Sequence, residues 1–262
     1  MEYSIVSQNV HQVSSPSAPG PSQPAPKVPR KMLKLGFHIA VSCYQVFVLY
    51  CLSQIRFQVN DDPLIKAIQK LHLRFLTNWN FFAQTTFFFV SVLVDLIRIT
   101  KAFPKVADKL QRLNSYFLFS IVIPLSCFVS IFFWSVFLYN RELVFPKVID
   151  QVMAPWLNHA VHTVIVVNLV IEIILVRHTL PKTSHSVSVL TVFMAVYLFV
   201  LINTYLTENL WIYPIFDKLN WPLRIVMFAL CLIVETLILF GARGINKIIW
   251  GQPEKKSKKK KK

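Results

Sequence analysis

The sequence predicts an all-α membrane protein with six transmembrane helices and both termini in the cytoplasm. Of its 262 residues, 55% are hydrophobic and 15% are charged, and the mean hydropathy is +0.52. A soluble domain of this length would be less apolar and more charged. The apolar residues form six runs of about 19 to 25 residues, long enough at about 1.5 Å per residue to cross a hydrocarbon core about 30 Å thick.

Hydropathy divides the chain into a tail, a membrane domain of six spans at 35–250 and a second tail. Residues 1–34 are rich in Pro and Ser and are expected to form a disordered cytoplasmic tail, because such a segment buries too little apolar surface to fold. Residues 251–262 form a basic C-terminal tail. Pro124 lies inside the third span and predicts a kink that neighbouring helices accommodate. The spans are residues 35–53, 79–97, 115–139, 157–176, 187–206 and 222–241.

The distribution of positive charge predicts the orientation. The loops at 54–78, 140–156 and 207–221 carry 7 Lys and Arg, whereas the remaining loops and the two tails carry 20. Cytoplasmic loops are the ones enriched in Lys and Arg, so both termini are expected in the cytoplasm. The formal charge of +16 therefore indicates topology and attraction to anionic lipid, and no nucleic-acid partner is expected.

The C-terminus, EKKSKKKKK, predicts a membrane of residence. Lys259 and Lys260 occupy the positions of a cytosolic di-lysine signal for retrieval to the endoplasmic reticulum. A basic tail attracted to anionic lipid is the alternative interpretation. We expect a multi-pass protein of the endoplasmic reticulum membrane, with the plasma membrane as the alternative.

The usual signatures of cofactor and metal chemistry are missing from the sequence. The four cysteines form no CxxC, and the five glycines form no GxSxG, GxGxxG or P-loop. His159 and His162 have an HxxH spacing, but the chain has seven histidines, too few for the several His boxes of a di-iron lipid oxidase. No cofactor and no metal are expected.

Polar residues open the second and fourth spans at the same end. In the fourth span, WLNHAVHT places Asn158, His159 and His162 within about one helical turn. Titratable side chains in a membrane span usually serve a function, because a charge at mid-bilayer costs about 2.5 kcal/mol or more. The second has Asn80 and Gln84 following Thr77 at spacings of three and four, on one helical face. These side chains could simply hydrogen-bond to backbone or to neighbouring helices.

Both spans run inward from the non-cytoplasmic side, so a hydroxyl and an imidazole can meet at one depth. A Thr hydroxyl is a weak nucleophile until an adjacent base takes its proton. Three carboxylates lie nearer the cytoplasmic ends of their spans, and the two glutamates could instead define a second polar site. The expected pairs are Glu172 and Glu235 with Arg177 or Arg243, and Asp95 with Arg98.

Four segments carry a resemblance that covers about residues 35 to 250, with six spans in matching order. They are WLNHAVHT, NRELVFPK (Asn140–Lys147), LWIYPIF (Leu210–Phe216) and FLTNWN (Phe75–Asn80). In these segments the chain resembles the family of androgen-induced protein 1 and the androgen-dependent TFPI-regulating protein. The resemblance implies a multi-pass membrane threonine hydrolase that cleaves fatty acid esters of hydroxy fatty acids.

The resemblance places the nucleophile at Thr77 and the catalytic histidine at His162. We expect an intramembrane lipid esterase, a threonine-type carboxylic ester hydrolase whose partners are its lipid substrate and the bilayer. Asn158 and Asn80 are candidates for orienting the imidazole or binding the oxyanion, and His159 and Gln84 are candidates for the substrate pocket. The alternative is a non-enzymatic six-span lipid-binding or signalling scaffold. A transporter is less favoured, because no span has paired Gly/Pro breaks.

Overall fold

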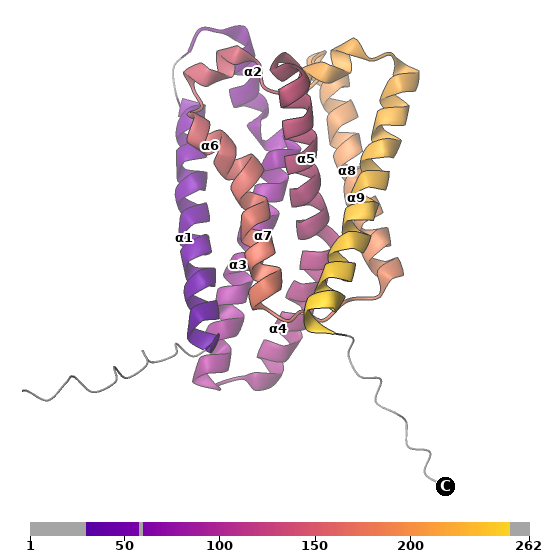
Figure 1. The fold of residues 1–262 in the computed structure, drawn as a ribbon. Coiled ribbons are helices and arrows are strands. Elements are labelled where there is room, and N and C mark those ends of the chain that lie inside the picture. The colour runs from indigo at the N-terminus through magenta and orange to yellow at the C-terminus, as the bar shows by residue number, and fades with distance from the viewer. Residues whose placement is uncertain (1–29, 58–59, 252–262) are drawn as a thin grey trace, which may run out of the picture.

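The computed structural model describes residues 30–57 and 60–251, and these form a bundle of long helices (Figure 1). The Pro-rich segment up to residue 29 and the lysine run with Lys259 and Lys260 lie outside the described residues. In the described part of the chain, six helices are long and apolar enough to cross a membrane. They are Arg30–Ile55, Leu76–Thr100, Pro104–Leu143, Pro155–Leu175, Thr183–Glu208 and Trp221–Trp250.

In the described residues the spans contain eight α-helical segments and two π turns, and short helices fill the connections. The α-helices of the spans are α1 (Arg30–Phe57), α3 (Leu76–Thr100), α4 (Pro104–Phe117), α5 (Ile123–Asn140), α7 (Ile165–Leu175), α8 (Thr183–Glu208) and α9 (Trp221–Trp250), with α6 (Pro155–His159) opening the fourth span. The π turns are η2 (Leu118–Val122) and η5 (Ala160–Val164). The connections hold α2 (Pro63–Leu71), η1 (His72–Arg74), η3 (Arg141–Leu143), η4 (Lys147–Gln151) and η6 (Pro214–Lys218).

The first helix begins inside the segment assigned to the N-terminal tail. Residues 30–34 are helical, so the predicted tail of residues 1–34 is too long by these five residues. Two of their basic side chains, those of Arg30 and Lys34, have partners on neighbouring helices. Lys34 Nζ lies 2.7 Å from Asp95 Oδ1, and the guanidinium of Arg30 lies 4.7 Å from the ring centroid of Trp250. Long basic side chains at a helix end can keep an apolar stem in the bundle and a charged tip outside it, so the helix continues past the apolar run.

The third span is much longer than its apolar run. The predicted loop at 98–114 is mostly helix α4, which begins at Pro104, a residue favoured at the first position of a helix. Pro124 does not break the span. The π turn η2 ends at Val122, two residues before Pro124. It contains Ser120, whose carbonyl would clash with the ring of Pro124 in a regular α-helix. The widened turn thus makes room for the ring.

The two ends of the bundle are named here by the elements that lie there. Helix α1 begins and α9 ends at the bottom of Figure 1, so we call this the terminal end. Helix α2 lies at the other end, which we call the α2 end. Within the bundle α3 packs along α1, and α5 packs along α9. Which end faces the cytoplasm stays a prediction.

Candidate functional site

The start of helix α3 fixes the position of Thr77 at the α2 end. The helix begins at Leu76, one residue after the short helix η1 ends at Arg74, so Thr77 is its second residue. Two side chains of the first turn bind carbonyls of η1: the Trp79 indole donates to Leu73 O at 2.7 Å, and the Asn78 amide donates to His72 O. These bonds satisfy carbonyls of η1 and hold the first turn of α3 against it.

The second π turn presents His162 to Thr77. His162 Nε2 lies 3.3 Å from Thr77 Oγ1, although the residues are 85 positions apart in the chain. Its other nitrogen, Nδ1, lies 2.8 Å from Asn158 Oδ1 and 3.0 Å from Asn158 O. Both of those oxygens are acceptors, so Nδ1 carries the proton and Nε2 is left as an acceptor for the Thr77 hydroxyl. π turns occur often at functional sites, and this one sets the histidine's direction.

Packing holds the imidazole in this orientation. The ring of Phe133 stacks on His162 with centroids 3.6 Å apart and an interplanar angle of 11°. His162 is buried, and so is Asn158. A hydroxyl, an imidazole acceptor and an orienting amide are the parts of a nucleophile–base pair of the Thr–His–Asn kind. A distance of 3.3 Å is long for this bond, but such bonds are often loose before substrate binds.

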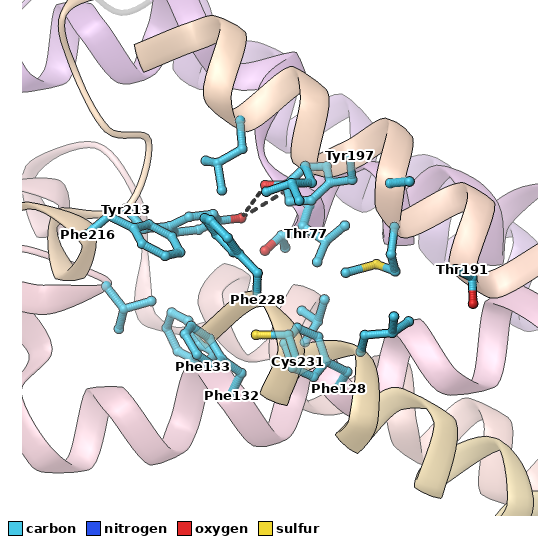
Figure 2. Close-up of a pocket in the computed structure, with 18 residues that line it drawn as sticks. Thr77, Phe128, Phe132, Phe133, Thr191, Tyr197, Tyr213, Phe216, Phe228 and Cys231 are labelled. Atoms are coloured by element: carbon cyan, nitrogen blue, oxygen red, sulfur yellow. Dashed lines mark hydrogen bonds between the residues drawn. The ribbon is translucent and has the colours of Figure 1, made fainter. Parts of the chain in front are cut away.

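Two apolar cavities meet at Thr77. The first, of about 220 Å³, lies among α5, α8 and α9, and Figure 2 shows Thr77 beside the tyrosines and phenylalanines that line it. The second, of about 300 Å³, lies towards α1 and α2 and contains His162. The residues that line both are Thr77, Phe133, Val144 and Tyr213. A molecule with an apolar arm in each cavity would therefore place its centre at the Thr77 hydroxyl.

Two of the predicted site residues on α3 lie elsewhere. Asn80 and Gln84 are fully buried and line neither cavity. Gln84 donates to Ile165 O at 2.9 Å, and the Asn80 carbonyl accepts from Ser126 Oγ at 2.7 Å. The stripe that the sequence predicts exists, but from Asn80 onward its side chains bind other helices, as polar groups in membrane bundles commonly do.

His159 also lies outside the cavities, although it is three residues from His162. Its ring stacks on Trp134 with centroids 4.9 Å apart, and its Nδ1 lies 3.1 Å from Thr163 Oγ1. It is exposed, whereas His162 is buried. The two histidines of WLNHAVHT therefore have separate surroundings, and only His162 contacts Thr77.

Two tyrosines beside Thr77 were not foreseen from the sequence. The hydroxyls of Tyr197 on α8 and Tyr213 before η6 lie 3.1 Å apart, and both accept from the Leu76 backbone N–H, at 3.1 and 3.0 Å (Figure 2). Tyr213 belongs to the segment LWIYPIF, whose resemblance was the one available signal. Tyr197 lies in an apolar span, and no motif or spacing in the sequence marks it as a site residue.

A second polar cluster lies at the terminal end. Both ring nitrogens of His38 lie 2.8 Å from carboxylate oxygens, one of Asp95 and one of Glu172. His178 Nε2 lies 3.0 Å from the other Glu172 oxygen, and Lys34 pairs with Asp95. These contacts link α1, α3 and α7, and they give Glu172, one of the two glutamates expected to define a second polar site, partners on other segments.

The predicted carboxylate–arginine pairs are wrong. Arg98 pairs with Asp108 at 3.1 Å, and Arg243 donates to Pro181 O at 2.7 Å. In the described part of the chain, neither oxygen of Glu235 has a hydrogen-bond partner. Sequence neighbours lie at different angles around a helix, and the helices that lie alongside decide the partners.

Among residues 30–57 and 60–251, no group of three or more His, Cys, Asp or Glu side chains is arranged to hold a metal ion.

Known proteins resemble this chain along most of its length. A family model described as FAR-17a/AIG1-like protein matches residues 33–247. The androgen-dependent TFPI-regulating protein of Homo sapiens is 30% identical over 226 residues, which cover 85% of this chain and 96% of the relative. Its Mus musculus counterpart is 32% identical over 226 residues, 86% of this chain and 96% of the relative. The androgen-induced gene 1 protein of Homo sapiens is 26% identical over 183 residues, 68% of this chain and 77% of the relative. No solved structure matches the chain significantly.

Proposed function

Because the chain belongs to the FAR-17a/AIG1-like family, we propose that it is an intramembrane lipid esterase with Thr77 as nucleophile and His162 as general base. Its substrates are fatty acid esters of hydroxy fatty acids. The observation that carries this proposal is the contact of 3.3 Å between Thr77 Oγ1 and an imidazole nitrogen whose partner nitrogen is held by Asn158. A hydroxyl that only stabilised the helix would not need an acceptor oriented in this way.

The chemistry has two steps at one hydroxyl. Thr77 Oγ attacks the ester carbonyl while His162 Nε2 takes its proton, and the tetrahedral intermediate breaks the bond to the alkoxy oxygen. His162 returns the proton to that oxygen, so the hydroxy fatty acid leaves and the acyl group stays on Thr77. Water then attacks the acyl-threonine, with His162 again accepting a proton and returning it to Thr77. The second product is the free fatty acid.

The two cavities match a substrate with two long apolar arms. The first cavity is lined almost entirely by apolar side chains of α5, α8 and α9 and suits a hydrocarbon chain. The second includes polar residues such as Asn78 and His72 beside its apolar wall. We assign the acyl arm to the first cavity and the hydroxy acid, with its carboxylate, to the second. An ester with two such chains can reach the bundle laterally from the lipid.

The test combines turnover with covalent labelling of purified protein. Thr77→Ala and His162→Ala should each abolish hydrolysis of a fatty acid ester of a hydroxy fatty acid, and the double variant should be little worse, because the two residues act as one unit. A fluorophosphonate hydrolase probe should label wild type and Thr77→Ser but not Thr77→Ala. A non-enzymatic scaffold would neither label nor turn over.

His159→Ala is the matched control, since His159 lies on the same turn but contacts neither Thr77 nor the cavities. It should keep most of the activity. Wild-type turnover by Thr77→Ala would disprove covalent catalysis. An inactive His159→Ala together with an active His162→Ala would assign the base to the other histidine.

We also propose that the terminal end faces the cytoplasm and that the protein resides in the endoplasmic reticulum. The charge count of 20 against 7 supports the orientation, and the C-terminal lysines support the location. Replacing residues 258–262 with serines should release protein to later compartments, as seen by microscopy. An unchanged distribution would place the retention signal elsewhere.

A further inference from the structure

We propose that the Tyr213 hydroxyl donates a hydrogen bond to the oxyanion that forms when Thr77 attacks the ester, and that Tyr197 positions and polarises it. This inference rests on the proposed function and adds to it the group that stabilises the transition state. Donors aimed at the developing negative charge supply much of the rate enhancement in acyl transfer. The residues predicted from the sequence for this role are placed for other tasks: the Asn158 oxygen accepts from His162, and Asn80 lines neither cavity.

Counting protons around the two tyrosines leaves one phenol proton free. The Leu76 N–H is shared between both hydroxyl oxygens, at 3.0 and 3.1 Å. The hydroxyls lie 3.1 Å apart, so one donates to the other and the second keeps its own proton. If Tyr197 donates, the Tyr213 oxygen accepts two hydrogen bonds, which strengthens Tyr213 as a donor.

The position of Tyr213 identifies it as the outer donor. Tyr213 lines both cavities, as Thr77 does, whereas Tyr197 lines only the first. In Figure 2 the two tyrosine hydroxyls meet next to Thr77 at the wall of the first cavity. The same point is the N-terminus of α3, where the helix dipole favours negative charge. A carbonyl oxygen of a substrate that spans both cavities would therefore lie against the Tyr213 hydroxyl.

The loop before α9 is built to hold this ring. The Arg224 guanidinium is buried and donates twice to Phe216 O, at 3.1 and 2.9 Å, and it lies 4.7 Å from the Trp211 ring centroid. These contacts fix the segment on both sides of Tyr213. The ring of Phe75 meets Tyr213 edge-on, with centroids 5.7 Å apart. Burial raises the pKa of Tyr213 above its ordinary value, so the phenol keeps its proton at neutral pH.

Steady-state kinetics of tyrosine variants test the assignment. Tyr213→Phe should lower kcat about 100- to 1000-fold with little change in KM, because the lost bond forms only in the transition state. Tyr197→Phe should lower kcat no more than about tenfold, since it removes one bond to Tyr213 and leaves the donor. The double variant should resemble Tyr213→Phe. Tyr205→Phe, on the same helix as Tyr197, is the matched control and should equal wild type.

A second substitution separates donation from packing. O-methyltyrosine at position 213 keeps the ring and an oxygen that can accept from Leu76 N–H, but it cannot donate. It should reproduce the loss of kcat while thermal unfolding stays near wild type. A kcat within threefold of wild type in Tyr213→Phe or the O-methyl variant would overturn the inference, as would a change confined to KM or a larger loss in Tyr197→Phe. Activity of Thr77→Ala would instead refute the proposed function itself.

Discussion

Replacing Asn158 with Ala tests how the imidazole is held. His162 Nδ1 has two acceptors, the Asn158 side-chain oxygen at 2.8 Å and the Asn158 backbone carbonyl at 3.0 Å. The substitution removes the first and leaves the second, so the proton stays on Nδ1 and Nε2 remains an acceptor. The loss is then that of one hydrogen bond, about 0.5–1.5 kcal/mol, which lowers kcat by about twofold to about tenfold.

The assay is release of free fatty acid from a fatty acid ester of a hydroxy fatty acid, measured by mass spectrometry on purified protein. Initial rates give kcat and KM, and His162→Ala sets the level without a base. Removing a general base alone typically costs about 100-fold or more. Asn158→Ala should thus lie clearly between wild type and His162→Ala. Phe133, stacked on the ring at 3.6 Å, remains in place to limit its rotation.

A loss in Asn158→Ala as large as in His162→Ala would refute this reasoning. It would mean that the backbone carbonyl cannot hold the tautomer alone, or that the side chain contacts the substrate. Thermal unfolding distinguishes these cases from misfolding, since a buried Asn contributes to packing as well.

Three further predictions concern stability, specificity and topology. Glu172→Ala should lower the free energy of unfolding by about 3–5 kcal/mol, because it leaves His38 buried without one of its two carboxylates. Thermal or denaturant unfolding measures this, and unchanged stability would mean that water replaces the carboxylate. Cys231→Trp fills part of the first cavity and should shift turnover towards substrates with shorter acyl chains. Each methylene excluded from the cavity should cost about 0.8 kcal/mol of binding free energy. A shift in the hydroxy acid preference instead would reverse the assignment of the two arms. A glycosylation site engineered near Asp61 should be modified in microsomes and one near Lys105 should not, and the opposite pattern would invert the orientation.

The contact between Thr77 and His162 could be predicted in part, because the depth of a residue in the membrane follows from its position along an apolar span. Thr77 and His162 lie near the starts of the second and fourth spans, and these two spans run in the same direction, so the two residues have similar depths. Depth does not give the angle around a helix axis, however. His159 and His162 have nearly the same depth, yet one contacts Thr163 on the outside and the other contacts Thr77.

The same distinction explains the errors at the carboxylates. The sequence predicts pairs of Asp95 with Arg98 and of Glu172 with Arg177 or Arg243. Both carboxylates instead bind His38, at separations of 57 and 134 residues. Tyr213 is a similar case, since it reaches Leu76 N–H across 137 residues from a connecting loop. No local pattern encodes such pairs.

The sequence by itself determined the six spans, their alternating directions and the two polar entries, because hydrophobic length and backbone hydrogen bonding in lipid allow few alternatives. Only the tertiary structure decided which polar groups meet. The π turn that directs His162, the amide that holds its proton and the tyrosine pair over Leu76 N–H all depend on helix rotation and on one ordered loop. Those are set by packing between distant segments, which decides which polar side chains of the candidate site face one another.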